Sequence, residues 1–267
     1  MPRHCHPILQ PARRRCPSLS WFFLLTALLS LPPAHGGTLV ETLARLRGGV
    51  VAVGTLTQPP GDPKSKPQAR YLGTGFAVAT GGLVVTNFHV VSGKNRKEGR
   101  LAVFSGKGRE ARIHEAKILK TDREHDLALL EIWGRRLTPL SLHEGGLLPA
   151  GRKTAFTGFP LGMVLGLYPV THEGIIAAVT PAAIPADSSR RLNAARIRRL
   201  RNPFLVYQLD AIAYPGNSGS PLYLPENGKV IGVVNSVFVK GSKESVLSTP
   251  SGITYAIPVK YVRKLLQ

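Results

Sequence analysis

Short apolar segments separated by turn-forming residues recur along the chain from Gly48 onward. A first series covers residues 50–56, 75–79, 83–87, 101–104, 111–119 and 127–133, and a second covers residues 152–158, 170–178, 205–211, 221–223, 230–239 and 253–257. The segments are rich in valine, isoleucine and leucine, and Gly, Pro, Asn and Asp lie between them, which is typical of β-strands joined by turns. Two sets of about six strands predict an all-β protein with two barrels.

Helical patterns are sparse in this chain. Amphipathic segments at residues 38–47 and 259–266 predict one helix before the first strand and one after the last. Residues 58–70, 92–100 and 184–201 are rich in Pro, Gly or basic side chains and predict loops. We therefore expect a first barrel at about residues 48–140, a second at about residues 150–258 and a short C-terminal helix at residues 259–266.

The N-terminal segment has the layout of an export signal. Three arginines at positions 13–15 precede the apolar run 21–31, which is shorter than the roughly 18 residues needed to span a bilayer. Two prolines and small residues follow the run. We therefore predict that residues 1–36 are a signal peptide and that residues 37–267 form the mature domain. An uncleaved anchor is the alternative, although the prolines cut the apolar run short.

Both cysteines, Cys5 and Cys16, precede this apolar run. Removal of the signal would leave a chain without cysteine, so no disulfide bond could stabilise it. An exported chain without disulfide bonds is typical of bacterial envelope proteins, and we expect a periplasmic or secreted location.

A candidate nucleophile lies in the string Gly216-Asn217-Ser218-Gly219. Glycines on both sides permit a tight turn that exposes the serine hydroxyl, and backbone N–H groups of such a turn can bind a developing oxyanion. We expect the N–H groups of Gly216 and Ser218, with Asn217 between them, to form this oxyanion hole. Taken alone, the string is equally consistent with an ordinary β-turn at the surface.

Two further strings contain the partners that a nucleophilic serine needs. His89 follows one apolar strand, and Asp126 stands at the mouth of another. A histidine can take the serine proton, and a carboxylate beside it fixes the tautomer of the ring. Taken singly, His89 could be a packed core residue and Asp126 a solvated strand cap. The chain order His89, Asp126, Ser218 nevertheless matches that of chymotrypsin-type proteases, with the first two residues from one barrel and the third from the other.

We expect the other ionisable residues near these strings to have structural roles. We expect Asp122 to be a turn residue, Asp210 a framework residue and His125 a solvated neighbour of Asp126. His114, His143 and His172 have no second ligand at metal spacing, so the sequence predicts no metal and no cofactor.

Several strings resemble the trypsin-like peptidases of the HtrA/Deg type. They are Thr86-Asn87-Phe88-His89-Val90-Val91, Asp126-Leu127-Ala128-Leu129-Leu130 and Gly216-Asn217-Ser218-Gly219-Ser220-Pro221, with framework matches at residues 73–76, 158–162, 174–176, 230–235 and 255–258. This resemblance implies two six-stranded Greek-key β-barrels of the chymotrypsin type. It also implies a serine endopeptidase that works through a Ser-His-Asp triad and an acyl-enzyme. The alternative is a non-catalytic two-barrel protein that binds peptides or anionic envelope polymers.

The chain departs from the family pattern at two points. Ser220 stands where the family more often has glycine, and no PDZ-like domain follows Pro258, so the resemblance implies neither peptide sensing nor cage formation and leaves the oligomeric state open. Asn217 has no charge with which to bind a new N-terminal amine. We therefore expect that the enzyme is not matured by the ion pair of digestive chymotrypsin-like enzymes.

Substrate preference depends on the residues that frame the primary pocket. In this fold these should be Ile212, Ala213 and Tyr214, together with the strand that carries Val234, Asn235 and Ser236. The strand should also pair with the substrate backbone. None of these residues is acidic, so cleavage after Lys or Arg is disfavoured and a small or medium aliphatic residue is expected.

The chain is strongly basic, with a formal net charge of +20. Part of this charge lies in an arginine-rich loop at residues 190–201, which is either a site for an anionic ligand or a solvated insertion. Nucleic acid is not indicated, because the loop lacks interleaved aromatic side chains. The expected partners are therefore protein or peptide substrates, with an anionic ligand at the loop as an open alternative.

Overall fold

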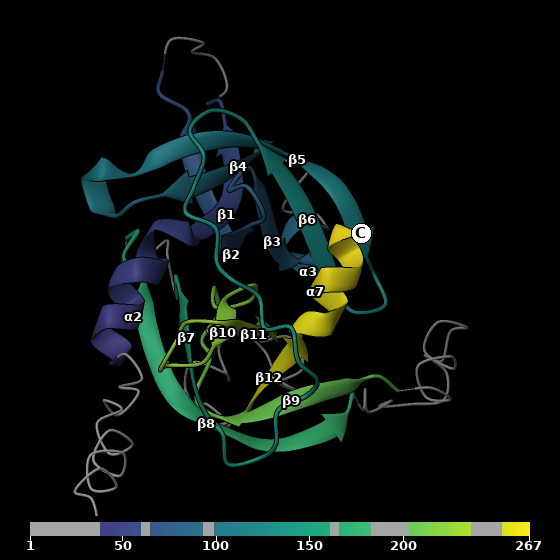
Figure 1. Cartoon of the computed structure of the whole chain (residues 1–267). Helices are drawn as coiled ribbons and strands as arrows, with labels where there is room; N and C mark the ends of the chain where they lie inside the picture. The colour runs from purple at the N-terminus through teal and green to yellow at the C-terminus, as the bar shows by residue number, and fades with distance from the viewer. Residues whose placement is uncertain (1–37, 60–64, 93–98, 161–165, 183–202, 236–252) are drawn as a thin grey trace, which may run out of the picture. The chain divides into compact units, whose positions relative to one another are not determined.

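A computed structural model of the chain describes residues 38–59, 65–92, 99–160, 166–182, 203–235 and 253–267 (Figure 1). The predicted signal peptide, the arginine-rich loop and Ser236 lie outside these residues. Within the described ranges, no helix has the length and apolar character that crossing a membrane requires.

The strands form two closed antiparallel barrels. The first contains β1 (Val50–Thr57), β2 (Gln68–Val78), β3 (Leu83–Asn87), β4 (Arg100–Ser105), β5 (Arg112–Asp122) and β6 (Leu127–Ile132). The second contains β7 (Lys153–Gly158), β8 (Val170–Pro181), β9 (Leu205–Asp210), β10 (Pro221–Tyr223), β11 (Val230–Asn235) and β12 (Ile253–Pro258). Strand order is β1-β2-β3-β6-β5-β4 in the first barrel and the equivalent β7-β8-β9-β12-β11-β10 in the second. The prediction of an all-β protein with two six-stranded barrels is confirmed.

The predicted loop 58–70 is wrong at its C-terminal end. Strand β2 begins at Gln68, because residues 68–71 pair with residues 54–57 of β1 beyond a bulge at Val53 and Gly54. A Cβ on Gly54 would lie 2.1 Å from the carbonyl oxygen of Arg70, so only glycine fits this close approach of two backbones. The basic and polar side chains of this segment predicted a loop, but a half-buried strand also tolerates such side chains on its outer face.

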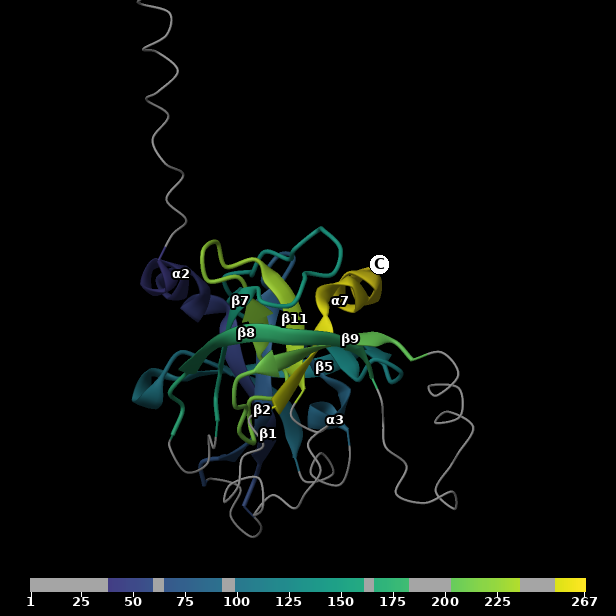
Figure 2. The same ribbon diagram turned by 90° about the horizontal axis from the view of Figure 1, so that it is seen from below.

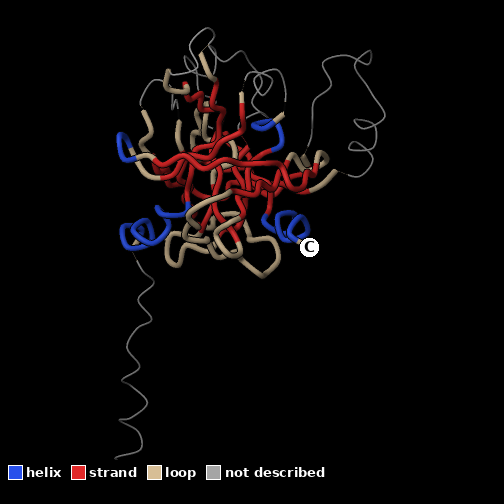
Figure 3. The backbone as a smooth tube through the Cα atoms, turned by 90° about the horizontal axis from the view of Figure 1, so that it is seen from above, coloured by secondary structure: helices blue, strands red, loops and turns tan. Residues whose placement is uncertain are grey.

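The helices lie outside the barrels, as Figure 3 shows in blue around the red strands. Helix α2 (Leu39–Leu46) begins at a capping box in which Thr38 and Glu41 bind each other's backbone N–H groups. The C-terminal helix α7 (Val259–Leu266) buries Val259, Val262 and Leu265 and packs against β11 of the second barrel and against β5 and β6 of the first (Figure 2). Helix α7 therefore joins the two barrels.

Buried side chains form three clusters. One cluster fills the first barrel around Val53, Val84 and Leu130, and another fills the second around Phe156 and Leu222. The third cluster crosses between the barrels and includes residues of both barrels and of helices α2 and α7. Because this shared core holds the barrels against each other, residues of the two barrels can form one site with fixed geometry.

Candidate active site

His89 and Asp126 form a close pair at one end of the first barrel. His89 lies on the single-turn helix α3 (Phe88–Val91) directly after β3, and Asp126 lies just before β6. Nδ1 of His89 is 2.6 Å from Oδ2 of Asp126, and the backbone N–H of His89 donates to Oδ1 at 2.9 Å. Because an ionised carboxylate only accepts hydrogen bonds, Nδ1 donates in this pair and Nε2 is left to accept. The side chain of His89 keeps 30% of its surface exposed, so part of the ring is open to solvent.

The backbone of Asp126 is held in an unusual conformation. Its φ angle is +52°, in the left-handed region that few residues other than glycine adopt. Its carbonyl oxygen accepts hydrogen bonds of 3.0 Å from the backbone N–H of Phe88 and from the side-chain amide of Asn87. These bonds stabilise the strained turn and keep the carboxylate directed at His89.

Asn235 of the second barrel also binds this carboxylate. Its side-chain Nδ2 donates to Oδ2 of Asp126 at 2.8 Å, and the residue is only 1% exposed. The sequence suggested instead that Asn235 faces the substrate pocket, and the structure shows its side chain directed at Asp126. The carboxylate thus accepts bonds from both barrels, which fixes its position more firmly than its own loop could.

Ser218 lies on a tight turn that packs against the first barrel. Its carbonyl oxygen accepts from the N–H of Thr74 at 2.9 Å, and the N–H of Gly219 donates to Val234 at 2.9 Å. Gly216 and Gly219 have φ angles of +101° and +90°. A Cβ on Gly219 would lie 2.0 Å from the carbonyl oxygen of Thr74, so a glycine is required at this position.

The turn of Ser218 and helix α3 approach each other across Gly73. A Cβ on Gly73 would lie 2.8 Å from Cγ2 of Val90, the residue after His89, and 3.0 Å from the carbonyl oxygen of Ser218. The hydrogen bond from Gly219 to Val234 places the same turn beside Asn235, which binds Asp126. The structure therefore brings the surroundings of His89, Asp126 and Ser218 to one place between the barrels.

Thr74 connects the two barrels at this turn. Its hydroxyl donates to the carbonyl oxygen of Gly216 at 2.7 Å and accepts from the N–H of Phe159 at 3.0 Å. This role of Thr74 could not be predicted beyond a framework match, because its hydrogen-bond partners lie far along the chain. A hydroxyl bound on both sides fixes the peptide that precedes Asn217, and so fixes the direction of the neighbouring N–H groups.

Asn217 is completely buried beneath the turn. Within the described ranges its side-chain Oδ1 and Nδ2 have no hydrogen-bond partner, and its backbone N–H donates to Tyr214 at 3.0 Å. A neutral amide tolerates this burial far better than a carboxylate would, since an unpaired buried charge is costly.

The predicted pocket residues divide into two groups. Ile212 is 36% exposed and Tyr214 is half-buried, so both reach the surface before the turn, while Ala213 is buried and its N–H donates to Thr254. Val234 is fully buried, and its backbone binds Gly219 and Ser220. Both backbone groups of Val234 are therefore bound within the protein. Ser236 of the same strand lies outside the described residues, so the pairing of this strand with substrate backbone stays a prediction.

The sequence prediction for His125 is wrong. This histidine is only 8% exposed, its Nδ1 lies 2.6 Å from Oδ2 of Asp122, and its ring stacks on Tyr261 of α7 at 3.8 Å. Asp122 also accepts from the N–H of His125 at 3.0 Å. His125 is buried because α7 returns to cover it, which its local sequence does not reveal. The hydrogen bonds between His125 and Asp122 stabilise the turn that precedes Asp126.

Burial lowers the pKa values of two histidines outside this site. Burial lowers the pKa of His172, whose ring stacks on Phe156. Burial also lowers the pKa of His114, and the positive charge of Arg112 adds to this effect against a backbone hydrogen bond to Trp133. Among the described residues, no group of three or more His, Cys, Asp or Glu side chains could hold a metal ion.

Comparisons with known proteins agree with this geometry. A family profile described as a trypsin-like peptidase domain matches residues 73–233. Proteins named probable periplasmic serine endoprotease DegP-like, from Halomonas elongata and Pseudomonas putida, are 30% identical to this chain over 204 and 206 residues, or 76% of it. The chain spans 36% of the length of each of these relatives.

A solved structure titled HtrA-type protease AlgW with decapeptide has a similar fold. Its TM-score is 0.62 at 23% sequence identity, and the match covers 86% of this chain and 66% of that one. At this identity the likeness concerns the fold.

Proposed function

Because the chain belongs to the trypsin-like peptidase family and carries a serine protease domain of the HtrA type, we propose that it is an endopeptidase that hydrolyses peptide bonds through an acyl-enzyme. In this proposal Ser218 is the nucleophile, His89 is the general base and then the general acid, and Asp126 orients His89. The observation that carries the proposal is the 2.6 Å contact between Nδ1 of His89 and a carboxylate that both barrels hold.

The order of proton transfers follows from the tautomer of His89. With its proton on Nδ1, the neutral ring accepts the proton of the Ser218 hydroxyl at Nε2 as Oγ attacks the carbonyl carbon of the substrate. The imidazolium that forms is stabilised by Asp126. It then gives the proton to the leaving amine as the C–N bond breaks, which leaves an ester between Ser218 and the acyl half of the substrate. Water repeats the sequence on this ester and releases the second product.

The negative charge that develops on the substrate oxygen needs hydrogen-bond donors. We assign this role to the backbone N–H groups of Gly216 and Ser218, with Asn217 between them as part of the same turn. The support is that Thr74 binds the carbonyl oxygen of Gly216 at 2.7 Å, which limits rotation of that peptide. Preorganised donors of this kind stabilise the transition state by about 3–4 kcal/mol each.

The proposed substrates are proteins or peptides with a small or medium aliphatic residue before the cleaved bond. Ile212, Ala213 and Tyr214 would form the described part of the pocket, and none of them offers a charge to Lys or Arg. Peptide substrates also fit the relatives, which are named as endoproteases, and the structural neighbour, which is titled as a complex with a decapeptide.

The proposed location is the periplasm or the exterior of the cell. Two observations support it: residues 1–36 have the composition of a signal peptide, and the relatives are named periplasmic.

The proposal is tested by following cleavage of an unfolded protein and of internally quenched peptides, with product masses identifying the cleaved bonds. Ser218→Ala and His89→Ala should reduce turnover by about a thousandfold or more. Ser141→Ala and His143→Ala remove the same side chains outside the site and should leave turnover unchanged. A folded wild-type protein that binds peptides without cutting them would favour the non-catalytic alternative.

A further inference from the structure

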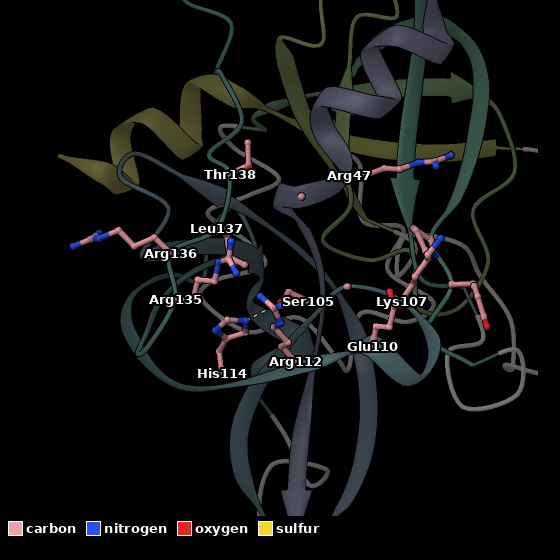
Figure 4. Close-up of a pocket in the computed structure, with 14 residues that line it drawn as sticks. Arg47, Ser105, Lys107, Glu110, Arg112, His114, Arg135, Arg136, Leu137 and Thr138 are labelled. Atoms are coloured by element: carbon pink, nitrogen blue, oxygen red, sulfur yellow. Dashed lines mark hydrogen bonds between the residues drawn. The ribbon is translucent and has the colours of Figure 1, made fainter.

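A cavity opens beside the first barrel, and we call it the basic pocket. It has a volume of about 830 Å³, and its lining includes Arg47, Lys107, Arg112 and Arg135 (Figure 4). The turn between β4 and β5, which carries Lys107 and leads to Arg112 at the start of β5, lies on the side of the first barrel away from α3 in Figures 1 and 2. The volume falls in the range of pockets that bind small molecules.

The charges of the basic pocket are unbalanced. Glu110 is the one carboxylate in its lining, and none of the four cations forms an ion pair with a described residue. A fifth cation, Arg136, points away in Figure 4 and donates to the backbone and hydroxyl oxygens of Thr80. Like charges that line one cavity repel one another, and a bound anion would reduce this repulsion.

The floor of the pocket is formed by a buried hydrogen bond. Oγ of Ser105 lies 2.8 Å from Nε2 of His114, and both residues are less than a tenth exposed. The pKa of His114 is lowered by burial and by Arg112. Burial, and to a smaller extent the charge of Arg112, therefore favour the neutral form of His114.

The walls are held by contacts that do not involve the cations. The N–H of Gly108 donates to Leu167 at 2.9 Å, and the N–H of Leu137 donates to Gly81 at 3.0 Å. The segments that carry Gly48 and Thr138 are also in contact, because a Cβ on Gly48 would lie 2.8 Å from Oγ1 of Thr138. The cations thus stand on a fixed frame, which lowers the ordering cost that a ligand would meet.

We propose that the basic pocket binds a compact ligand with several phosphate groups, present either as a free oligophosphate or as the head group of a phosphorylated lipid. Three of the four cations are arginines, whose planar forks match phosphate oxygens in pairs. Four cations and a cavity of this size suit several linked phosphates better than a single small anion. This site is separate from the proposed protease site, so either proposal can fail alone.

Titration calorimetry of the full chain with inorganic tripolyphosphate at physiological salt tests the proposal. Replacing Arg112 and Arg135 by serine should weaken binding by about tenfold or more, since both forks are lost. The matched control replaces Lys153 and Lys229, which are exposed and form no ion pair within the described ranges. It removes the same charge and should change binding by less than about twofold.

A second pair of substitutions and a vesicle assay complete the test of the basic pocket. Replacing Arg47 and Lys107 by serine alters the opposite wall and should also weaken binding, which covers the case in which the first pair of substitutions unfolds the protein. Flotation with phosphatidylcholine vesicles that contain phosphatidylinositol bisphosphate, whose head group carries several phosphates, distinguishes a lipid head group from a free oligophosphate. Absence of tripolyphosphate and vesicle binding by the wild-type chain, or equal losses in the control and pocket variants, would overturn the proposal.

Discussion

The side-chain amide of Asn235 donates a 2.8 Å hydrogen bond to Oδ2 of Asp126, the oxygen that lies 2.6 Å from Nδ1 of His89. One carboxylate oxygen therefore accepts from a residue of each barrel. Movement between the barrels would shift Asp126, and with it the ring of His89. The barrel interface is thus part of the proposed catalytic geometry.

The Asn235 bond gives the first prediction. Asn235→Ala should lower kcat by about ten- to a hundredfold, because a hydrogen bond to a charged group contributes roughly 1.5–3 kcal/mol. KM should stay nearly constant, since the amide binds Asp126 rather than substrate. Steady-state kinetics with a quenched peptide measure both, and Asn227→Ala, which removes an exposed asparagine, serves as the control. A kcat equal to that of wild type in Asn235→Ala would show that Asp126 does not need this donor.

Thr74 gives a second prediction, about the turn before Ser218. Thr74→Val keeps the shape of the side chain but removes the hydroxyl that binds Gly216 and Phe159. We expect kcat to fall by about tenfold, from the loss of roughly 1.4 kcal/mol of transition-state stabilisation as the donors lose their direction. Thr74→Ser restores the hydroxyl and should recover most of the activity. If the valine variant kept the activity of wild type, or if the serine variant were as impaired as the valine variant, the hydroxyl would not be what positions the turn.

Gly158 gives a third prediction, about stability. A Cβ on Gly158 would lie 2.0 Å from Oγ of Ser220 and 2.8 Å from Oδ1 of Asn217. Gly158→Ala should therefore lower the free energy of unfolding by about 1–3 kcal/mol, as overpacking does. Urea unfolding measures this. Adding Ser220→Gly removes the nearest atom and should recover part of the loss, whereas additive effects of the two substitutions would contradict the predicted clash.

The buried histidines give a fourth prediction, about pH. His172 and His114 have pKa values lowered from the ordinary 6.5 in the folded chain. Below about pH 6.5 the unfolded chain binds protons that the folded chain does not, so the free energy of unfolding should fall as the pH falls through this region. His172→Phe keeps the stacking on Phe156 but cannot ionise. Its free energy of unfolding should therefore fall less between about pH 7.5 and about pH 5.5 than that of wild type, and a loss of the same size would contradict this prediction.

The strands and the candidate triad could be predicted because short strings carry them. Apolar runs and turn residues mark the barrels, and His89, Asp126 and Ser218 each stand in a recognisable string. The supporting contacts could not be predicted in this way. Asn235 lies 109 residues from Asp126, and Thr74 lies 142 residues from Gly216. The burial of His125 likewise depends on Tyr261 of α7, which follows the whole second barrel in the sequence.

In the proposed mechanism, His89 and the surrounding turn make Ser218 a nucleophile. Fluorophosphonates modify serines that are activated in this way, and intact-protein mass spectrometry counts the added groups. The wild-type chain should gain one group, with peptide mapping locating it on Ser218, and His89→Ala and Ser218→Ala should gain none. A folded wild-type protein that stays unlabelled, or labelling of a serine other than Ser218, would contradict the assignment.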